Sequence, residues 1–108
     1  TNLGIVLLLA PLCAVPEGED LRQGVKRVLA SSTVRDSELV YEAIRLAIPG
    51  GLGQAKEQDL GDRPTLPLLQ IMGMAADRDG IARQYQTGFA DVFEIGLPAL
   101  EQGFSLTK

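Results

Sequence analysis

The chain has 108 residues, of which 45% are apolar and 22% charged, a balance that is typical of one globular domain. There is no histidine, and Cys13 is the only cysteine, which excludes an internal disulfide, CxxC sites, histidine-ligated zinc and Ser-His-Asp or Cys-His triads. The net charge of −4 argues against nucleic acid or an anionic membrane as a partner, and the single thiol fits a cytoplasmic location.

The first segment, residues 3–15, carries no charge. It predicts a helix that is apolar all round and buried on every side, with a kink at Pro11. A buried strand over residues 4–9 is the competing interpretation, and the length of the apolar run favours the helix. The run is shorter than the about 20 residues that cross a bilayer. Because the chain opens directly into this helix, we expect a fragment of a longer protein.

The next two helices are expected over residues 20–30 and from Thr33 or Asp36 to Ile48. Apolar residues recur at helical spacing in both segments, and Thr33 and Asp36 are alternative N-caps for the second of them. Pro49-Gly50-Gly51 ends that helix, and residues 50–64 then form a long connection of the kind that is usually functional or mobile.

Three more helices are expected in the second half. Thr65 is predicted to cap a helix that has Pro67 in its first turn and buries Leu66, Leu69, Met72 and Ala76. Residues 75–80 either end that helix or cap the next, which runs from Ile81 to near Gly96, and Pro98 opens a last one. Because no segment alternates with a period of two, we predict a single, partial all-α domain over residues 1–108, a multi-helix bundle around the buried first helix.

Three polar clusters lie at predicted helix ends and are candidate binding sites. Thr1-Asn2-Leu3-Gly4 precedes the first helix, where free N–H groups and the helix dipole suit a phosphate, although a plain N-cap explains it as well. Pro49-Gly50-Gly51-Leu52-Gly53 lets backbone N–H groups approach a ligand closely. It is neither a Walker loop nor a Rossmann fingerprint, and a C-cap followed by a linker is the alternative.

The third cluster is Asp77-Arg78-Asp79 with Arg83. Two aspartates can share a Mg²⁺ with phosphate oxygens, and either arginine can hold a phosphate in bidentate fashion. Capping aspartates with a surface ion pair are the alternative interpretation. Because all three clusters lie at helix ends, their convergence would form a polar cleft that suits a polyphosphate.

The clusters belong to an ordered set of motifs, namely Thr1-Asn2-Leu3-Gly4, Pro49-Gly50-Gly51-Leu52-Gly53, Ala76-Asp77-Arg78-Asp79, Ala82-Arg83-Gln84-Tyr85, Gly88-Phe89 and Gly96-Leu97-Pro98. This set resembles the triphosphoribosyl-dephospho-CoA synthase family, particularly its branch in archaea and in bacteria of C1 metabolism. The resemblance extends over essentially the whole chain but only over the middle of the family's usual length.

The resemblance implies an all-helical enzyme that uses ATP and Mg²⁺. It attaches the ribose triphosphate of ATP to the ribose 2′-hydroxyl of dephospho-CoA and releases adenine. The implied catalytic carboxylates are Asp77 and Asp79, which also bind metal together with Asp59. The implied phosphate-binding residues are Thr1, Asn2, Gly50, Gly51, Gly53, Arg78 and Arg83.

One departure from the family pattern leaves other functions open. The citrate-lyase-associated branch continues its first motif with His and Lys, where this chain has Asn2 and Leu3. The alternatives are therefore a related helical enzyme that acts on another nucleotide or a pterin-type cofactor of C1 metabolism, or a non-enzymatic helical module. The sequence leaves open whether the protein forms a homo-oligomer.

Overall fold

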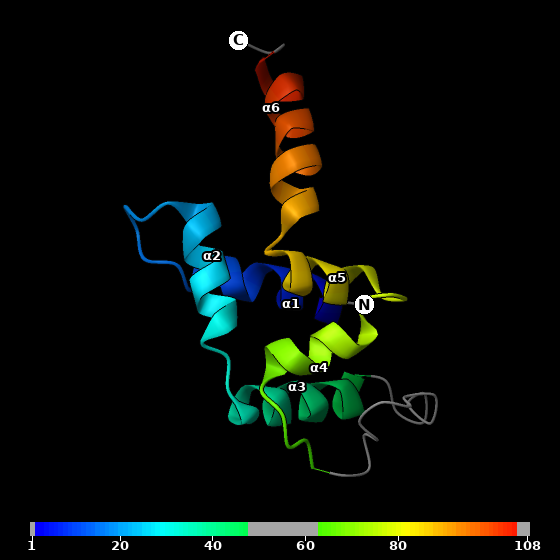
Figure 1. Ribbon diagram of the computed structural model, residues 1–108. Coiled ribbons are helices and arrows are strands. Elements are labelled where there is room, and N and C mark those ends of the chain that lie inside the picture. The colour runs from blue at the N-terminus through cyan, green and yellow to red at the C-terminus, as the bar shows by residue number, and fades with distance from the viewer. Residues whose placement is uncertain (1, 48–62, 106–108) are drawn as a thin grey trace.

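A computed structural model describes residues 2–47 and 63–105, and for the last two of these the backbone alone (Figure 1). The described part contains helices and no strands, which confirms the predicted all-α class. The helices are α1 (Asn2–Cys13), α2 (Leu21–Ala30), α3 (Val34–Ala47), α4 (Leu68–Ala75), α5 (Gly80–Thr87), the π-helical turn η1 (Val92–Gly96) and α6 (Leu97–Ser105). No helix in these residues is long and apolar enough to cross a membrane.

The caps of α2 and α3 follow from local sequence. The Asp20 carboxylate accepts the backbone N–H of Gln23 at 2.9 Å, as expected of an N-cap. Thr33 and Asp36, predicted as alternatives, act together as a capping box. The Thr33 N–H donates to the Asp36 carboxylate at 2.8 Å, and the Asp36 N–H donates to the Thr33 hydroxyl at 3.1 Å.

The predicted cap of α4 is wrong. Helix α4 begins at Leu68 after an extended Pro67, so Thr65 lies too far upstream to cap it. The donors of its first turn are taken up by the α2–α3 connection instead. Leu69 N–H donates to the Ser32 hydroxyl at 2.9 Å, and Leu68 N–H donates to the Thr33 carbonyl at 3.3 Å. Because α4 begins later than predicted, Leu68 points into the core and is 8% exposed, whereas Leu66 lies before the helix and is 36% exposed.

The predicted helix from Ile81 to Gly96 is also wrong, because it is broken in the middle. Helix α5 ends at Gly88, which has a φ of 67° and cannot continue a right-handed helix. Phe89 also has a positive φ, 63°, which is costly for a residue with a Cβ. Its side chain is fully buried, and this burial offsets the cost.

After the break, η1 and α6 take a new direction. Arg22 of α2 forms an ion pair with Glu94 and lies over the ring of Phe93, 5.7 Å from its centroid. These contacts tie η1 to α2, whereas α6 extends away from the rest of the molecule (Figure 1). Pro98 is the second residue of α6, which continues from η1 without a break, so this proline does not lie at a free helix start.

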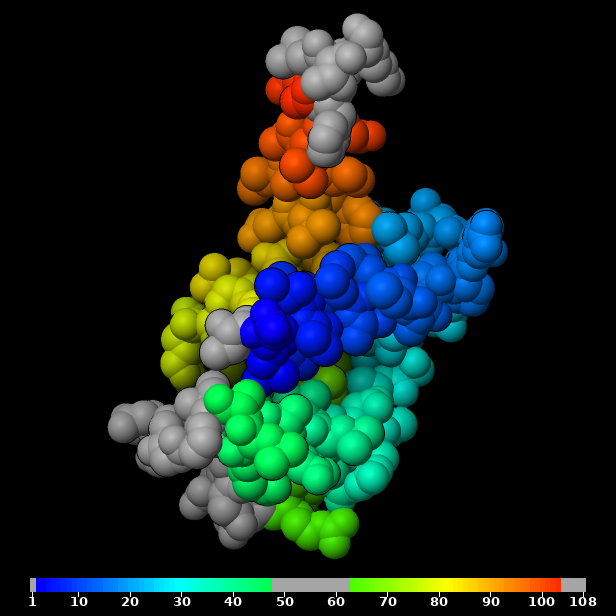
Figure 2. Space-filling model, turned by 180° about the vertical axis from the view of Figure 1, so that it is seen from behind, coloured from blue at the N-terminus to red at the C-terminus, as the bar shows by residue number. Residues whose placement is uncertain are grey.

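The core lies where α1, α2, α4 and α5 meet and contains Val25, Leu29, Leu68, Tyr85 and Phe89. The first helix is not buried on every side, as the sequence predicted. Leu8 and Leu12 pack against the core, but Ile5, Val6 and Leu9 are 51–57% exposed. Figure 2 shows α1, in blue, on the surface of that face. An apolar run in the sequence indicates that a helix will pack against other segments, but it does not show which of its faces they cover.

Candidate functional site

Helices α1 and α5 run side by side in the same direction. A Cβ on Gly4 would lie 3.0 Å from Cδ1 of Ile81, and the Tyr85 hydroxyl donates to the Leu7 carbonyl at 2.6 Å. Residue numbers thus rise together along both helices, by about one turn between the two contacts. The N-termini of α1 and α5 therefore lie at the same end of the molecule, with exposed Asn2 in the first turn of α1.

Parallel helices with neighbouring N-termini concentrate positive potential, because each helix carries the equivalent of about half a positive charge at its start. In α5 the Asp79 carboxylate neutralises part of this positive potential. Its Oδ1 accepts the N–H groups of Ile81 at 2.9 Å and Ala82 at 3.1 Å. The capping interpretation of Asp79 is thereby confirmed. Both bonds are made by Oδ1, so an additional ligand would bind Oδ2.

Asp77 and Arg78 lie in the exposed turn between α4 and α5. The Asp77 side chain is 81% exposed, and its Oδ1 accepts a hydrogen bond from Arg78 Nη1 at 3.2 Å. Arg78 also reaches back to the Met74 carbonyl at 3.4 Å. Such an exposed pair contributes little to stability. Both charges are therefore accessible to a ligand from solvent.

Arg83 is held against the same turn. Its Nε donates to the carbonyl of Ala76, a buried residue, at 3.1 Å. This bond uses one of the five guanidinium donors, and the side chain as a whole is exposed. Arg78 and Arg83 thus both flank the turn that precedes α5, one and four residues from Asp79 along the chain.

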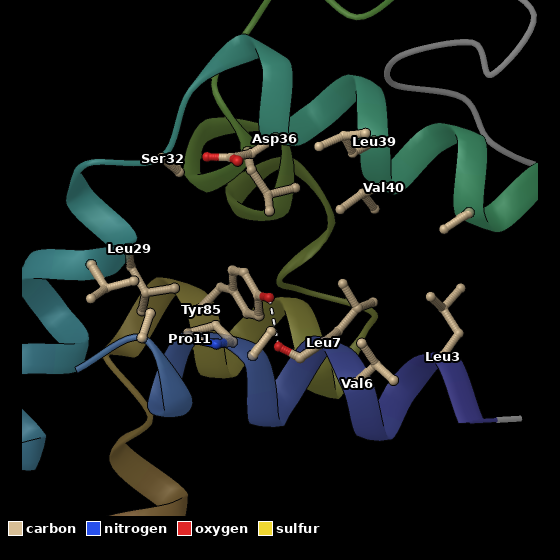
Figure 3. Close-up of a pocket in the computed structure, with 15 residues that line it drawn as sticks. Leu3, Val6, Leu7, Pro11, Leu29, Ser32, Asp36, Leu39, Val40 and Tyr85 are labelled. Atoms are coloured by element: carbon tan, nitrogen blue, oxygen red, sulfur yellow. Dashed lines mark hydrogen bonds between the residues drawn. The ribbon is translucent and has the colours of Figure 1, made fainter. Parts of the chain in front are cut away.

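The end of α3 lies at the same side. Leu3 and Ala43 line one cavity, and Figure 3 shows α3 continuing past Leu3 toward the start of α1. Thr1, Gly50, Gly51, Gly53 and Asp59 lie outside the described residues. The structure thus brings together Asn2, Asp77, Arg78, Asp79 and Arg83 at one end of the molecule. Their roles stay predictions.

The turn between α4 and α5 offers only some of the ligands that a Mg²⁺ ion needs. In the described ranges 2–47 and 63–105, no three acidic or cysteine side chains gather closely enough to hold a metal. The turn supplies two carboxylates at most, from Asp77 and Asp79. Mg²⁺ is commonly bound by one or two carboxylates together with substrate phosphates. The two described carboxylates therefore fit an ion that arrives with a polyphosphate.

A cavity of about 340 Å³ between α1 and α3 was not predicted from the sequence (Figure 3). Its walls are almost entirely apolar, and none of the described site residues, Asn2, Asp77, Arg78, Asp79 and Arg83, lines it. Its polar members are already engaged, Ser32 and Asp36 in helix caps and Tyr85 with Leu7. Burial, and to a smaller extent the Asp36 charge, raises the pKa of Tyr85 to about 12, so its hydroxyl stays a donor.

The family model described as CitG, ATP:dephospho-CoA triphosphoribosyl transferase, matches residues 1–107. The chain belongs to this family. CitG is a transferase family, which agrees with the resemblance carried by the glycine-rich and Asp-Arg-Asp motifs. No curated protein matches the chain, and no solved structure does. The family match and the geometry of the helix ends are therefore the two observations on which a function rests.

Proposed function

We propose that the chain supplies part of the active site of a triphosphoribosyl transferase. In this reaction the ribose triphosphate of ATP moves to the 2′-hydroxyl of dephospho-CoA, and adenine leaves. The observation that carries the proposal is the convergence of the N-termini of α1 and α5 beside the turn that holds Asp77, Arg78 and Asp79. The proposed substrates are the two named in the description of the CitG family, ATP and dephospho-CoA.

The triphosphate is assigned to the end where α1 and α5 begin. Two aligned helix dipoles attract an anion there, although the protein as a whole is acidic and Asp79 already accepts the N–H groups of Ile81 and Ala82. Arg83 is the better placed of the two arginines, because its Nε bond to the Ala76 carbonyl fixes the guanidinium beside the turn. Arg78 adds a second positive charge on the exposed side of the turn.

The reaction is a substitution at the anomeric carbon of the ATP ribose. The bond from this carbon to N9 of adenine breaks, its electron pair leaves with the base, which takes up a proton from solvent, and the acceptor 2′-oxygen forms the new bond. The 2′-hydroxyl proton needs a base, and Asp77 is assigned this role because its carboxylate is exposed while Asp79 Oδ1 caps α5. A Mg²⁺ bound with the triphosphate would neutralise its charge, with Asp77 and Asp79 as the available ligands.

The test is adenine release from ATP in the presence of dephospho-CoA and Mg²⁺, measured by chromatography. It uses the complete polypeptide in which these residues occur. We expect release by the wild type and a loss of about 100-fold or more in Asp77→Asn, the range of a lost general base. Asp20→Asn is the matched control, because Asp20 caps α2 and has no role in the proposed site. Equal rates in the two variants would overturn the assignment of Asp77.

A second candidate is favoured by Asn2-Leu3, which replaces the His-Lys of the citrate-lyase-associated branch. It is a related transferase that uses another nucleotide or a pterin-type cofactor as acceptor. Adenine release with such an acceptor but not with dephospho-CoA would establish it. If neither acceptor supports release and Mg²⁺ with ATP does not raise the unfolding temperature, the chain is a non-enzymatic helical module.

A further inference from the structure

The hydrogen bond between Tyr85 and Leu7 links two helices that are far apart in sequence. Tyr85 is 3% exposed and lies in the core, where its ring packs at 6.0 Å from that of Phe89. Its hydroxyl donates to the Leu7 carbonyl at 2.6 Å, across 78 residues of sequence. A buried tyrosine usually finds such a partner, but a carbonyl inside a helix is normally occupied by the N–H four residues later.

Pro11 is the reason that the Leu7 carbonyl can accept this bond. Residue 11 is the helical partner of residue 7, and proline has no N–H to donate. Helix α1 nevertheless continues to Cys13, so the carbonyl stays in helical geometry without its usual donor. Figure 3 shows the Tyr85 hydroxyl pointing at the Leu7 carbonyl, one turn before Pro11.

The bond also fixes the position of α1 against its neighbours, which hydrophobic packing alone determines poorly. The helix contains no charged residue and is apolar on every face, so hydrophobic packing alone would accept several rotations and translations. A directional bond to one carbonyl selects one register. One turn earlier, Gly4 packs so closely on Ile81 that a Cβ there would lie at 3.0 Å, which leaves little room for a shift.

We propose that Tyr85 is a positioning residue, whose hydroxyl uses the carbonyl left open by Pro11 to hold the start of α1 against the start of α5. This role rests on the proposed function, in which the triphosphate binds at those two helix ends. Tyr85 itself acts through α1 and does not touch the substrate.

A double-mutant cycle separates positioning from simple satisfaction of the carbonyl. Tyr85→Phe leaves the Leu7 carbonyl without a donor and lowers the folding equilibrium constant about tenfold, measured by urea unfolding. In a Pro11→Ala background the new N–H of residue 11 serves this carbonyl, so the same change costs less than about threefold. Equal losses in both backgrounds would overturn the link between Pro11 and Tyr85.

The KM for ATP in the adenine-release assay gives the second readout. An N–H at residue 11 restores the helix but does not tie α1 to α5. Tyr85→Phe should therefore raise KM about fivefold or more in both backgrounds, with a smaller change in kcat. Val25→Ala, a core truncation on α2, is the control and lowers stability without raising KM.

The outcomes distinguish the two proposals. A KM that returns to the wild-type value in the double variant means that Tyr85 is only a stabilising residue, and it overturns the positioning role. Absence of adenine release by the wild type overturns the proposed function and the role that rests on it. The urea cycle still reports on the bond itself in that case.

Discussion

Asp79 caps α5 and is proposed to bind metal as well, and different substitutions can separate these two roles. Asp79→Ala removes an acceptor of two N–H groups, at 2.9 and 3.1 Å, whereas Asp20→Ala removes an acceptor of one, at 2.9 Å. Loss of an N-cap costs about 0.5–2 kcal/mol. We therefore expect about 1.5–2 kcal/mol for Asp79→Ala and about 1 kcal/mol for Asp20→Ala, measured by urea unfolding followed by circular dichroism.

Asp79→Asn keeps the capping oxygen and removes the charge. The loss of the charge–dipole interaction should cost only about 0.3–1 kcal/mol, and Asp20→Asn should cost the same. If the Asp79 carboxylate also binds metal with the triphosphate, adenine release falls in Asp79→Asn and stays at the wild-type rate in Asp20→Asn. If Asp79→Ala is as stable as the wild type, Asp79 does not stabilise α5 as a cap. Full activity of Asp79→Asn would refute the metal-binding role.

Two further predictions concern the break after α5 and the buried phenol. Gly88→Ala should lose about 1–2 kcal/mol in urea unfolding, because φ is 67° there, whereas Gly73→Ala, in open space within α4, should gain about 0.5–1 kcal/mol. A gain in both would contradict the left-handed turn. The pKa of Tyr85 is raised from 10.0 to about 12. The contribution of its neutral hydroxyl to folding stability is therefore complete below pH 10 and is lost as the pH rises toward 12. The urea midpoint of the wild type should fall more steeply over that range than that of Tyr85→Phe, and equal slopes would contradict the burial of the phenol.

Local sequence signals were sufficient to predict the starts of the helices that are capped by residues next to their first turn. Asp20, Thr33 and Asp36 bond to N–H groups within three residues, so sequence alone locates the starts of α2 and α3. The cap of α4 was missed because Ser32 lies 37 residues from Leu69. No local pattern contains such a contact.

The break at Gly88 was missed for a different reason. The apolar spacing through Tyr85, Phe89 and Val92 continues a helical pattern, and a lone glycine is tolerated in a helix. The break allows Phe89 to be fully buried, and this burial exists only in the folded chain. The exposure of half of α1 depends on tertiary packing in the same way.

For the candidate site, the sequence predicted the clusters but not their relative direction. That α1 and α5 run parallel follows from the contacts of Gly4 with Ile81 and of Leu7 with Tyr85. One signal for the second contact was present, since a proline inside a helix opens the carbonyl four residues earlier. A buried tyrosine needs an acceptor, but the sequence does not say which carbonyl it will find.

The mass of dephospho-CoA after incubation with ATP, Mg²⁺ and the full-length protein tests the proposed transfer most directly. We expect a product heavier by one triphosphoribosyl group, formed in equal amount with free adenine and lost in Asp77→Asn. Unchanged dephospho-CoA, with ATP intact or converted only to ADP or AMP, would contradict it.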